Sequence, residues 1–236
     1  NLRYYLGYGT LLGAIRNEKI IPWDDDIDII MPREDYMRLI EIFPKDSNYD
    51  ILSIYNNKNY YYPFIKMIDK RTKVIEQNFK EIENLGVYID IFPIDGLPKK
   101  HKVFEIQMFI LKEMLKLSYI KSLESSSIII SLLKLILCPI PKIIGYKKMV
   151  NKIDKKARKY KIEDSEKIAV TVDYVLIKKN IIQKKQLEGS KRIFEKEEYV
   201  VPKEPELILK LLYGENYIEP VKSSGHNKNI VYIKEG

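Results

Sequence analysis

The sequence predicts an α+β protein with a mixed sheet and a mainly helical C-terminal half. Three observations carry this prediction. Short β-rich runs are spread through about the first hundred residues, helix starts lie between them, and a long stretch of helical periodicity follows. Glycine and proline punctuate the first part and become sparse in the middle of the chain.

The β-rich runs of the first part are Ile27 to Met31, Tyr62 to Ile68 and Val87 to Phe92. One helix is predicted to begin after the tight turn at Gly9. Another runs from Pro32 to Phe43, with proline in its first turn, where the missing N–H costs nothing. Helices and strands therefore alternate, as in a small mixed α/β unit.

After Pro98 the periodicity becomes helical. Within residues 101–124 the apolar positions are Val103, Phe104, Ile106, Ile110, Met114 and Leu117, with lysine and glutamate between them. We therefore predict a core at residues 1–98 and a helical part at residues 99–236. No internal repeat or low-complexity linker separates the two, so we expect the helical part to pack on the core as one compact protein.

The composition bounds the class of protein. With 236 residues, 45% of them hydrophobic, the chain can bury a substantial core, and its one cysteine, Cys138, excludes an intrachain disulfide framework and a cysteine-based zinc cluster. The net charge of +8 favours anionic partners or reflects a compositional drift towards lysine. We expect no nucleic acid, because aromatic and arginine residues do not interleave. We also expect no signal peptide, and a helix preceding Asn1.

The segment from Ile128 to Ile144 is strongly apolar. It is too short for a bilayer crossing, which needs about 20 apolar residues, and Lys134, Pro139 and Pro141 interrupt it. We favour a buried helix. The alternative is a helix at a membrane surface, which the basic stretch after it supports, so that residues 128–158 would form a peripheral membrane contact.

The most informative passage is the acidic run Trp23-Asp24-Asp25-Asp26-Ile27-Asp28. On a strand, Asp26 and Asp28 point the same way, about 6.6 Å apart, while Ile27 and Ile29 face the core. Two carboxylates so close raise each other's proton affinity unless a cation neutralises them. The alternatives are a solvated strand end and a calcium loop, but the calcium loop requires glycine where the chain has Ile29.

A second carboxylate lies within an apolar strand. Asp90 is flanked by Ile89 and Ile91, where an unpaired charge would be costly, so it needs a partner. The partner is either a metal ion shared with the first cluster or a lysine or arginine side chain. We expect Asp95, which precedes Gly96, to be a turn residue.

A third element is Gly7-Tyr8-Gly9-Thr10 before the first helix. Glycine admits a ligand close to the backbone, and a helix start favours anions, so Gly9 and Thr10 are candidate phosphate contacts. The spacing is neither a dinucleotide fingerprint nor a P-loop. Arg16 and Lys66 could add positive charge, or be ordinary surface side chains.

Three motifs together resemble the LicD family. They are YLGYGTLLGAIR at residues 5–16, IPWDDDID at residues 21–28 and DIFPIDG at residues 90–96, and the chain is also similar to the family at Phe194-Glu195, Val201-Pro202, Tyr213 to Tyr217 and Pro220. The family includes phosphocholine transferases of bacterial surface glycans, such as lipopolysaccharide, teichoic acid or capsule, and is related to the fukutin-type transferases.

The resemblance implies a nucleotidyltransferase-like core. It places the helix start on Gly9-Thr10 and the metal and catalytic carboxylates on Asp26, Asp28 and Asp90, with one or two Mg²⁺ ions, or Mn²⁺ in their place. Lys66 and Arg71-Thr72 fit a further family stretch, which makes Lys66 an expected phosphate contact. Asp24 and Asp25 are expected to support or cap the site, and Trp23 to pack. Asn17-Glu18-Lys19 departs from the family pattern, which leaves donor and acceptor details open.

From this resemblance we expect transfer of phosphocholine, or a similar phosphoalcohol, from a CDP-activated donor to a sugar hydroxyl of a glycan or its lipid-linked precursor. The alternative is an enzyme with the same fold that transfers the nucleotide itself. A third possibility is a non-catalytic membrane- or glycan-binding protein. The expected location is cytoplasmic, on the inner face of a bacterial membrane.

Overall fold

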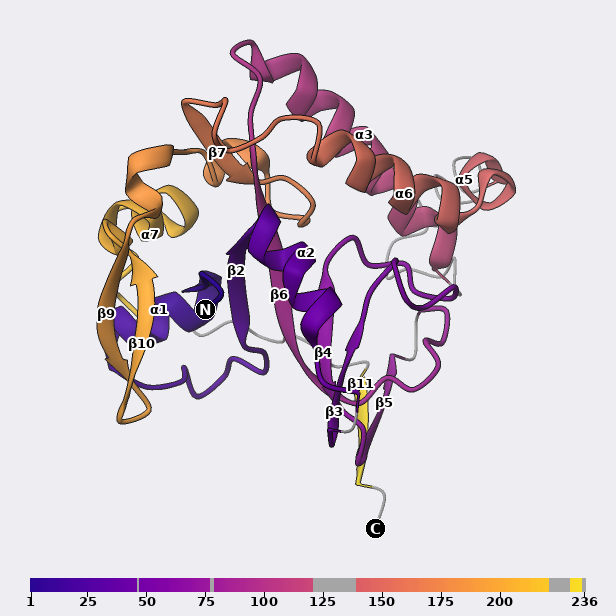
Figure 1. The fold of residues 1–236 in the computed structure, drawn as a ribbon, viewed down its shortest axis with the longest axis horizontal. Coiled ribbons are helices and arrows are strands. Elements are labelled where there is room, and N and C mark those ends of the chain that lie inside the picture. Colours follow the sequence, from indigo (N-terminus) through magenta and orange to yellow (C-terminus); the bar gives the residue numbers. More distant parts are fainter. Residues whose placement is uncertain (46, 77–78, 121–138, 221–229, 235–236) are drawn as a thin grey trace.

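The computed structural model is a mixed α+β fold (Figure 1), as the sequence predicts. It describes residues 1–236 apart from 46, 77–78, 121–138, 221–229 and 235–236. The strands are β1 Tyr5–Leu6, β2 Asp28–Pro32, β3 Tyr49–Leu52, β4 Ile65–Asp69, β5 Thr72–Glu76, β6 Val87–Gly96, β7 Lys167–Val170, β8 Ile182–Gln183, β9 Gly189–Phe194, β10 Glu197–Pro202 and β11 Ile230–Lys234. The α-helices are α1 Tyr8–Arg16, α2 Arg33–Ile42, α3 His101–Tyr119, α5 Pro139–Ile144, α6 Tyr146–Ala157 and α7 Pro205–Tyr213, and the short 3₁₀ helices are η1 Ile177–Lys179 and η2 Lys184–Leu187.

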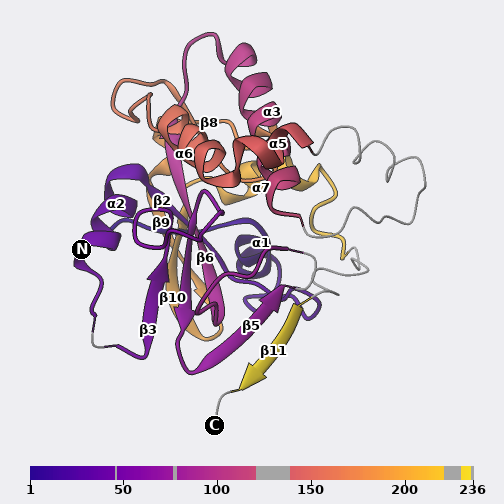
Figure 2. The same ribbon diagram turned by 90° about the vertical axis from the view of Figure 1, so that its right-hand side faces the viewer.

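Strand β6 is the centre of the main sheet. It pairs parallel with β2 on one side and antiparallel with β4 on the other, and β1 and β3 extend the sheet outwards. Beyond the end of β4, β7 pairs antiparallel with the last residues of β6 and carries β8. Two further pairs stand apart from this sheet, β9 with β10 and β5 with β11, and Figure 2 shows the second of them.

The two faces of the sheet bury different side chains, because neighbouring residues of a strand point to opposite faces. On one face, Met31, Ile65 and Ile91 pack with Tyr36 of α2. On the other, Ile68 and Phe92 join the larger core beneath α1, α3 and α7. The alternation places Asp28, Lys66 and Asp90 on this second face, on adjacent strands.

A buried ion network ties α2 and α6 to the sheet. The guanidinium of Arg33 donates to both oxygens of Asp95 at 2.8 and 2.6 Å and to Asp154 at 3.0 Å. Asp95 is only 1% exposed and lies within β6, so the expectation that it is a turn residue is wrong. The strand continues through Asp95 because β7 pairs with it there.

Among the described residues, the second half of the chain mixes helices with strands, so the prediction that it is mainly helical is not confirmed. Besides four α-helices among the described residues it supplies β7 and β8 to the main sheet and the β9–β10 pair, so the sheet crosses the expected boundary at residue 98. Helix α3 lies along α6 (Figure 1). It buries Phe104, Met108 and Leu115, whereas Val103, Ile106 and Ile110, which also belong to the helical apolar pattern, are 50–63% exposed.

The apolar segment that we predicted as a buried helix lies largely outside the described residues, which resume at Pro139. Its described end forms α5, where Ile140 and Ile143 are 63% and 84% exposed. Within the described part of the chain, no helix has the length and apolar character required to cross a membrane.

Candidate active site

The start of α1 and the start of β2 are held together by backbone and hydroxyl groups. The Gly7 N–H donates to the Asp28 carbonyl at 2.9 Å, and the Asp28 N–H donates to the Thr10 hydroxyl at 2.9 Å. Tyr8 opens the helix with φ of 42°, a left-handed value that is uncommon for a bulky residue. Thr10 therefore anchors the strand that carries Asp28, and its role as a phosphate contact stays a prediction.

The helix start that we predicted as a phosphate seat faces a carboxylate of the chain itself. A Cβ atom on Gly9 would lie 2.1 Å from Oδ2 of Asp24, so only glycine leaves room for this carboxylate. The N-terminal end of a helix favours negative charge. Gly9 thus contributes by admitting Asp24, and direct binding of phosphate by Gly9 stays a prediction.

The acidic run is not a regular strand throughout. Strand β2 begins at Asp28, and residues 24–27 precede it without regular structure. One oxygen from each of Asp24, Asp25 and Asp26 lies within 4.8 Å of the others, a spacing at which these carboxylates could hold a metal ion. Asp25 and Asp24 thus lie beside Asp26, although we expected only supporting roles for them.

Asp28 and Asp90 face each other across the parallel pair β2–β6. They are register partners on strands that lie about 4.8 Å apart, and both are buried, 7% and 8% exposed. Burial raises the pKa of Asp28 well above its usual value, and the negative charges of Asp26 and Asp90 raise it further. Asp26 and Asp90 are therefore close enough to Asp28 for their charges to act on it, and a metal site shared by the three stays a prediction.

Asp90 has a lysine partner. Nζ of Lys66, on the neighbouring strand β4, donates to both Asp90 oxygens at 2.8 and 3.1 Å. The same ammonium lies 3.4 Å from the ring centroid of Tyr88 and 4.7 Å from that of Tyr62, and Lys66 is 2% exposed. Of the two partners that the sequence left open, the structure supplies the ion pair. Lys66 orients Asp90, and a phosphate contact by Lys66 stays a prediction.

Even with this partner, burial raises the pKa of Asp90 to about 6, because the lowering effect of Lys66 does not fully offset it. Asp28 and Asp90 therefore concentrate negative charge in a poorly solvated place. Together with the oxygens of residues 24–26, this is the donor set and the charge imbalance that a divalent cation would relieve. The acidic residues present therefore fit a Mg²⁺ site, with Asp24, Asp25 and Asp26 as the group whose oxygens lie closest together. A site built on Asp26, Asp28 and Asp90 stays a prediction.

Two residues of this cluster were missed from the sequence. Asp173 follows β7, and its charge raises the pKa of Asp28. Tyr213 ends α7, and burial followed by the charges of Asp28 and Asp24 raises its pKa. In the sequence, Asp173 directly follows the β-rich run Ile168 to Val172, and this position was a readable signal for it. Tyr213 had no such signal beyond its motif.

Arg16 and Trp23 line a cavity of about 370 Å³, together with Asp24 and Tyr213. Trp23 also packs against the main core, as expected.

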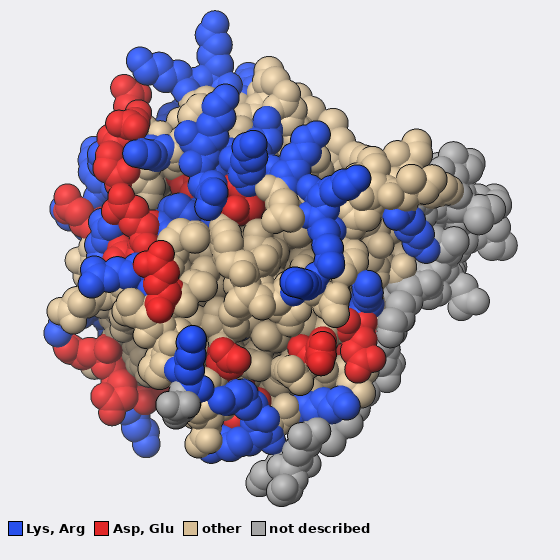
Figure 3. Space-filling model, turned by 45° about the vertical axis from the view of Figure 1, so that its right-hand side comes forward, with Lys and Arg blue, Asp and Glu red and all other residues tan. Residues whose placement is uncertain are grey.

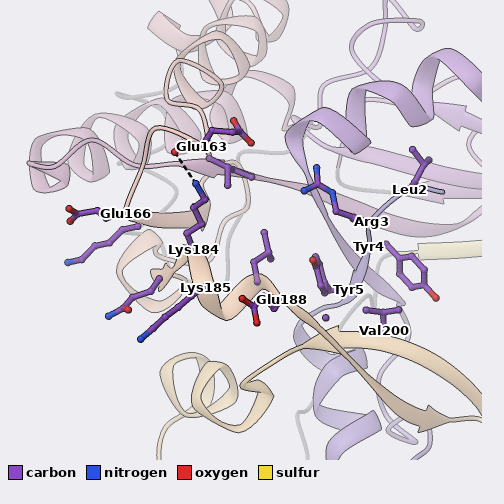
Figure 4. A pocket seen from close by; sticks show the side chains of 15 residues that line it. Leu2, Arg3, Tyr4, Tyr5, Glu163, Glu166, Lys184, Lys185, Glu188 and Val200 are labelled. Carbon is purple, nitrogen blue, oxygen red and sulfur yellow. Dashed lines mark hydrogen bonds between the residues drawn. The ribbon is translucent and has the colours of Figure 1, made fainter.

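A second, larger cavity, of about 1170 Å³, lies away from the acidic cluster (Figure 4). Its wall combines Arg3 and Tyr5 with residues 162–167 and 183–189, Lys184 donates there to the Glu163 carbonyl at 2.9 Å, and it shares no residue with the acidic cluster.

Comparison with known proteins identifies the first half of the chain. Residues 1–125 match the model of the family described as LicD/FKTN/FKRP, nucleotidyltransferase domain. Over 110 residues, 43% of this chain, the sequence is 34% identical to the lipopolysaccharide cholinephosphotransferase LicD of Haemophilus influenzae. Over 45 residues, 19% of the chain, it is 49% and 47% identical to uncharacterized proteins of Rickettsia prowazekii and Rickettsia typhi. The matches span 38%, 17% and 15% of these three relatives.

Proposed function

Because the chain belongs to the LicD/FKTN/FKRP family, we propose that it transfers phosphocholine from a CDP-activated donor to a sugar hydroxyl of a bacterial surface glycan or its lipid-linked precursor. The observation that carries the proposal is the convergence of Asp26, Asp28 and Asp90 beside the start of α1. All three carboxylates and the helix start lie within the matched residues 1–125. The name of the Haemophilus relative supports phosphocholine as the transferred group.

In this proposal, Asp26 and Asp28 hold a divalent cation, with Asp24 and Asp25 close enough to share it. When bound, Mg²⁺ would neutralise the donor's diphosphate and stabilise the charge that develops on its oxygens. The sugar oxygen attacks the distal phosphorus, the bond from that phosphorus to the bridging oxygen breaks, and CMP leaves.

Asp90 is our candidate for the base that takes the proton of the attacking hydroxyl. A carboxylate with a pKa near 6 is mostly ionised at neutral pH yet more basic than an ordinary aspartate, which suits proton abstraction. Lys66 would keep this carboxylate oriented through its two hydrogen bonds. The role of Lys66 is then positioning.

Product analysis tests the proposal. The chain is incubated with CDP-choline, Mg²⁺ and a glycan acceptor, and we expect CMP and a phosphocholine-bearing acceptor in equal amounts. Asp26→Asn should lower the rate by at least about 100-fold, whereas the exposed control Asp164→Asn should leave it unchanged. Diphosphate release, or an acceptor carrying the nucleotide, would establish the rival nucleotidyl transfer.

We also propose that the protein acts at the inner face of the membrane. The exposed isoleucines of α5 lie next to the lysines of α6, of which Lys147, Lys148, Lys152 and Lys155 are exposed. Figure 3 shows lysine and arginine side chains gathered over the upper part of the surface that it displays. This is the height at which α3 and α6 lie in Figure 1. Exposed apolar and basic groups side by side favour contact with anionic lipid.

Vesicle sedimentation tests the membrane contact. Ile140→Ser with Ile143→Ser should weaken binding to phosphatidylglycerol vesicles, whereas Ile42→Ser, which alters an isoleucine that is 56% exposed on α2, should not. Binding that is strong in every variant while CDP-choline is never turned over would favour the non-catalytic reading instead.

A further inference from the structure

The cavity beside Asp24 is walled by aromatic rings. Trp23 comes from the segment before β2, and Tyr213 and Tyr217 come from the end of α7 and the turn after it. Its volume of about 370 Å³ is within the range of small-molecule sites. Tyr213 and Tyr217 lie beyond residue 125, so the matched family domain supplies only one side of this cavity.

The charged groups of the wall are Asp24, Glu219 and Arg16. Two carboxylates and one guanidinium give the wall a formal charge of −1. Aromatic faces are negative as well, so rings and carboxylates together favour a cation. A cation without N–H groups gains more from such a wall than from hydrogen-bond acceptors, because it has no proton to donate.

Arg16 adds a positively charged hydrogen-bond donor to the cavity wall. Its Nε atom is buried, and no acceptor among the described residues lies within hydrogen-bonding distance of it. A buried donor without an acceptor costs about 1–3 kcal/mol. A phosphate oxygen of a ligand in the cavity would remove this cost through a charge-assisted hydrogen bond.

Asp24 connects the cavity to the acidic cluster. It lines the cavity, and one of its carboxylate oxygens lies within 4.8 Å of oxygens of Asp25 and Asp26. A ligand in the cavity therefore lies next to the carboxylates that we propose to hold the donor's diphosphate. The cavity and the cluster are adjacent halves of one extended site.

We propose that this cavity binds the trimethylammonium group of the donor, with Trp23, Tyr213 and Tyr217 as its aromatic wall and Arg16 on the neighbouring phosphate. The inference rests on the proposed function, in which the donor carries choline. It adds the groups that distinguish choline from other alcohols. The aromatic wall would prefer a quaternary ammonium over an uncharged alcohol, since only the ammonium interacts with the ring faces and with Asp24 and Glu219.

The test is calorimetric binding of CDP-choline and CDP-glycerol, in Mg²⁺, to the full chain and to Trp23→Leu and Tyr213→Leu. We expect each leucine variant to bind CDP-choline about 3- to 30-fold more weakly and CDP-glycerol unchanged, since a cation–aromatic contact contributes about 0.5–2 kcal/mol. Tyr213→Phe keeps the ring and should stay within about 3-fold of the natural chain. Tyr49→Leu, which alters a tyrosine on β3 that is 47% exposed, is the matched control.

An equal loss for both ligands would place the cytosine ring in the cavity and overturn the proposal, and so would no loss for either. This binding test is independent of the test of the proposed function, because the proposed transfer is measured by CMP release. Normal CMP release with unaltered choline preference in the leucine variants would overturn the cavity assignment alone. A choline preference that the leucine variants abolish, in a chain that transfers nothing, would support the cavity assignment and refute the transferase.

Discussion

The buried pair of Lys66 and Asp90 allows the most quantitative prediction. Their side chains are 3% and 11% exposed, and the shorter of their two hydrogen bonds is 2.8 Å. Removing one partner of a buried ion pair costs about 3–5 kcal/mol, because the remaining charge is left in a poorly solvated place. In metal-free buffer at pH 7, Lys66→Met should therefore lower the free energy of unfolding by about this amount.

The stability that Lys66→Met loses should be larger at pH 7 than at pH 5. Burial raises the pKa of Asp90 from 3.8 to about 6 with Lys66 in place, a shift equivalent to about 3 kcal/mol. The folded state then binds the proton more tightly than the unfolded state, so stability falls as the pH rises from about 4 through about 6. Without Lys66 the folded-state pKa rises further, so the variant should lose clearly less stability at pH 5 than at pH 7.

Urea unfolding followed by circular dichroism, at both pH values, measures this loss. The double variant Lys66→Met with Asp90→Asn removes both charges and should recover most of the stability. Lys58→Met, at an exposed lysine, is the control. If Lys66→Met stays within about 1 kcal/mol of the natural chain at pH 7, or loses as much at pH 5, the reasoning about this pair is refuted.

Three further predictions concern the surroundings of the site. Arg33→Met leaves two buried carboxylates without their guanidinium and should cost about 3–5 kcal/mol in urea unfolding; a cost below about 1 kcal/mol would contradict the network. Gly9→Ala should displace Asp24 and lower kcat/KM for CDP-choline by about 10- to 100-fold; unchanged kcat/KM would show that this carboxylate does not matter. Asp28→Asn should raise the melting temperature in metal-free buffer, because it removes a charge that its neighbours disfavour, and should abolish stabilisation by Mg²⁺; a lower metal-free melting temperature would contradict this charge balance.

The sequence predicted those parts of the site that depend on local pattern. Alternation along a strand was enough to separate Asp28 from Ile29, which packs with the residues on the α2 side of the sheet. The apolar neighbours of Asp90 were enough to predict that its carboxylate needs a partner. The identity of the partner of Asp90 was beyond such reasoning. It depends on the register between β4 and β6, which is set by tertiary pairing.

Helical periodicity did not determine which apolar residues of α3 are buried. Helix α3 has apolar residues on more than one side, and packing against α6 decides that Phe104 and Met108 are buried while Val103 and Ile106 are exposed. Tyr213 and Asp173 reach the acidic cluster from distant parts of the chain, so no local spacing could associate them with Asp28.

The central claim is that the acidic cluster, through a divalent cation, holds a CDP-activated donor. Thermal unfolding with Mg²⁺ and a panel of CDP-choline, CDP-ribitol, CDP-glycerol, UDP-sugars and ATP tests it most directly, since a ligand that binds the folded state raises the melting temperature. The account predicts a rise that requires both Mg²⁺ and a CDP compound, is largest with CDP-choline and disappears in Asp26→Asn. An equal rise in Asp26→Asn, or no rise with any nucleotide, would contradict it.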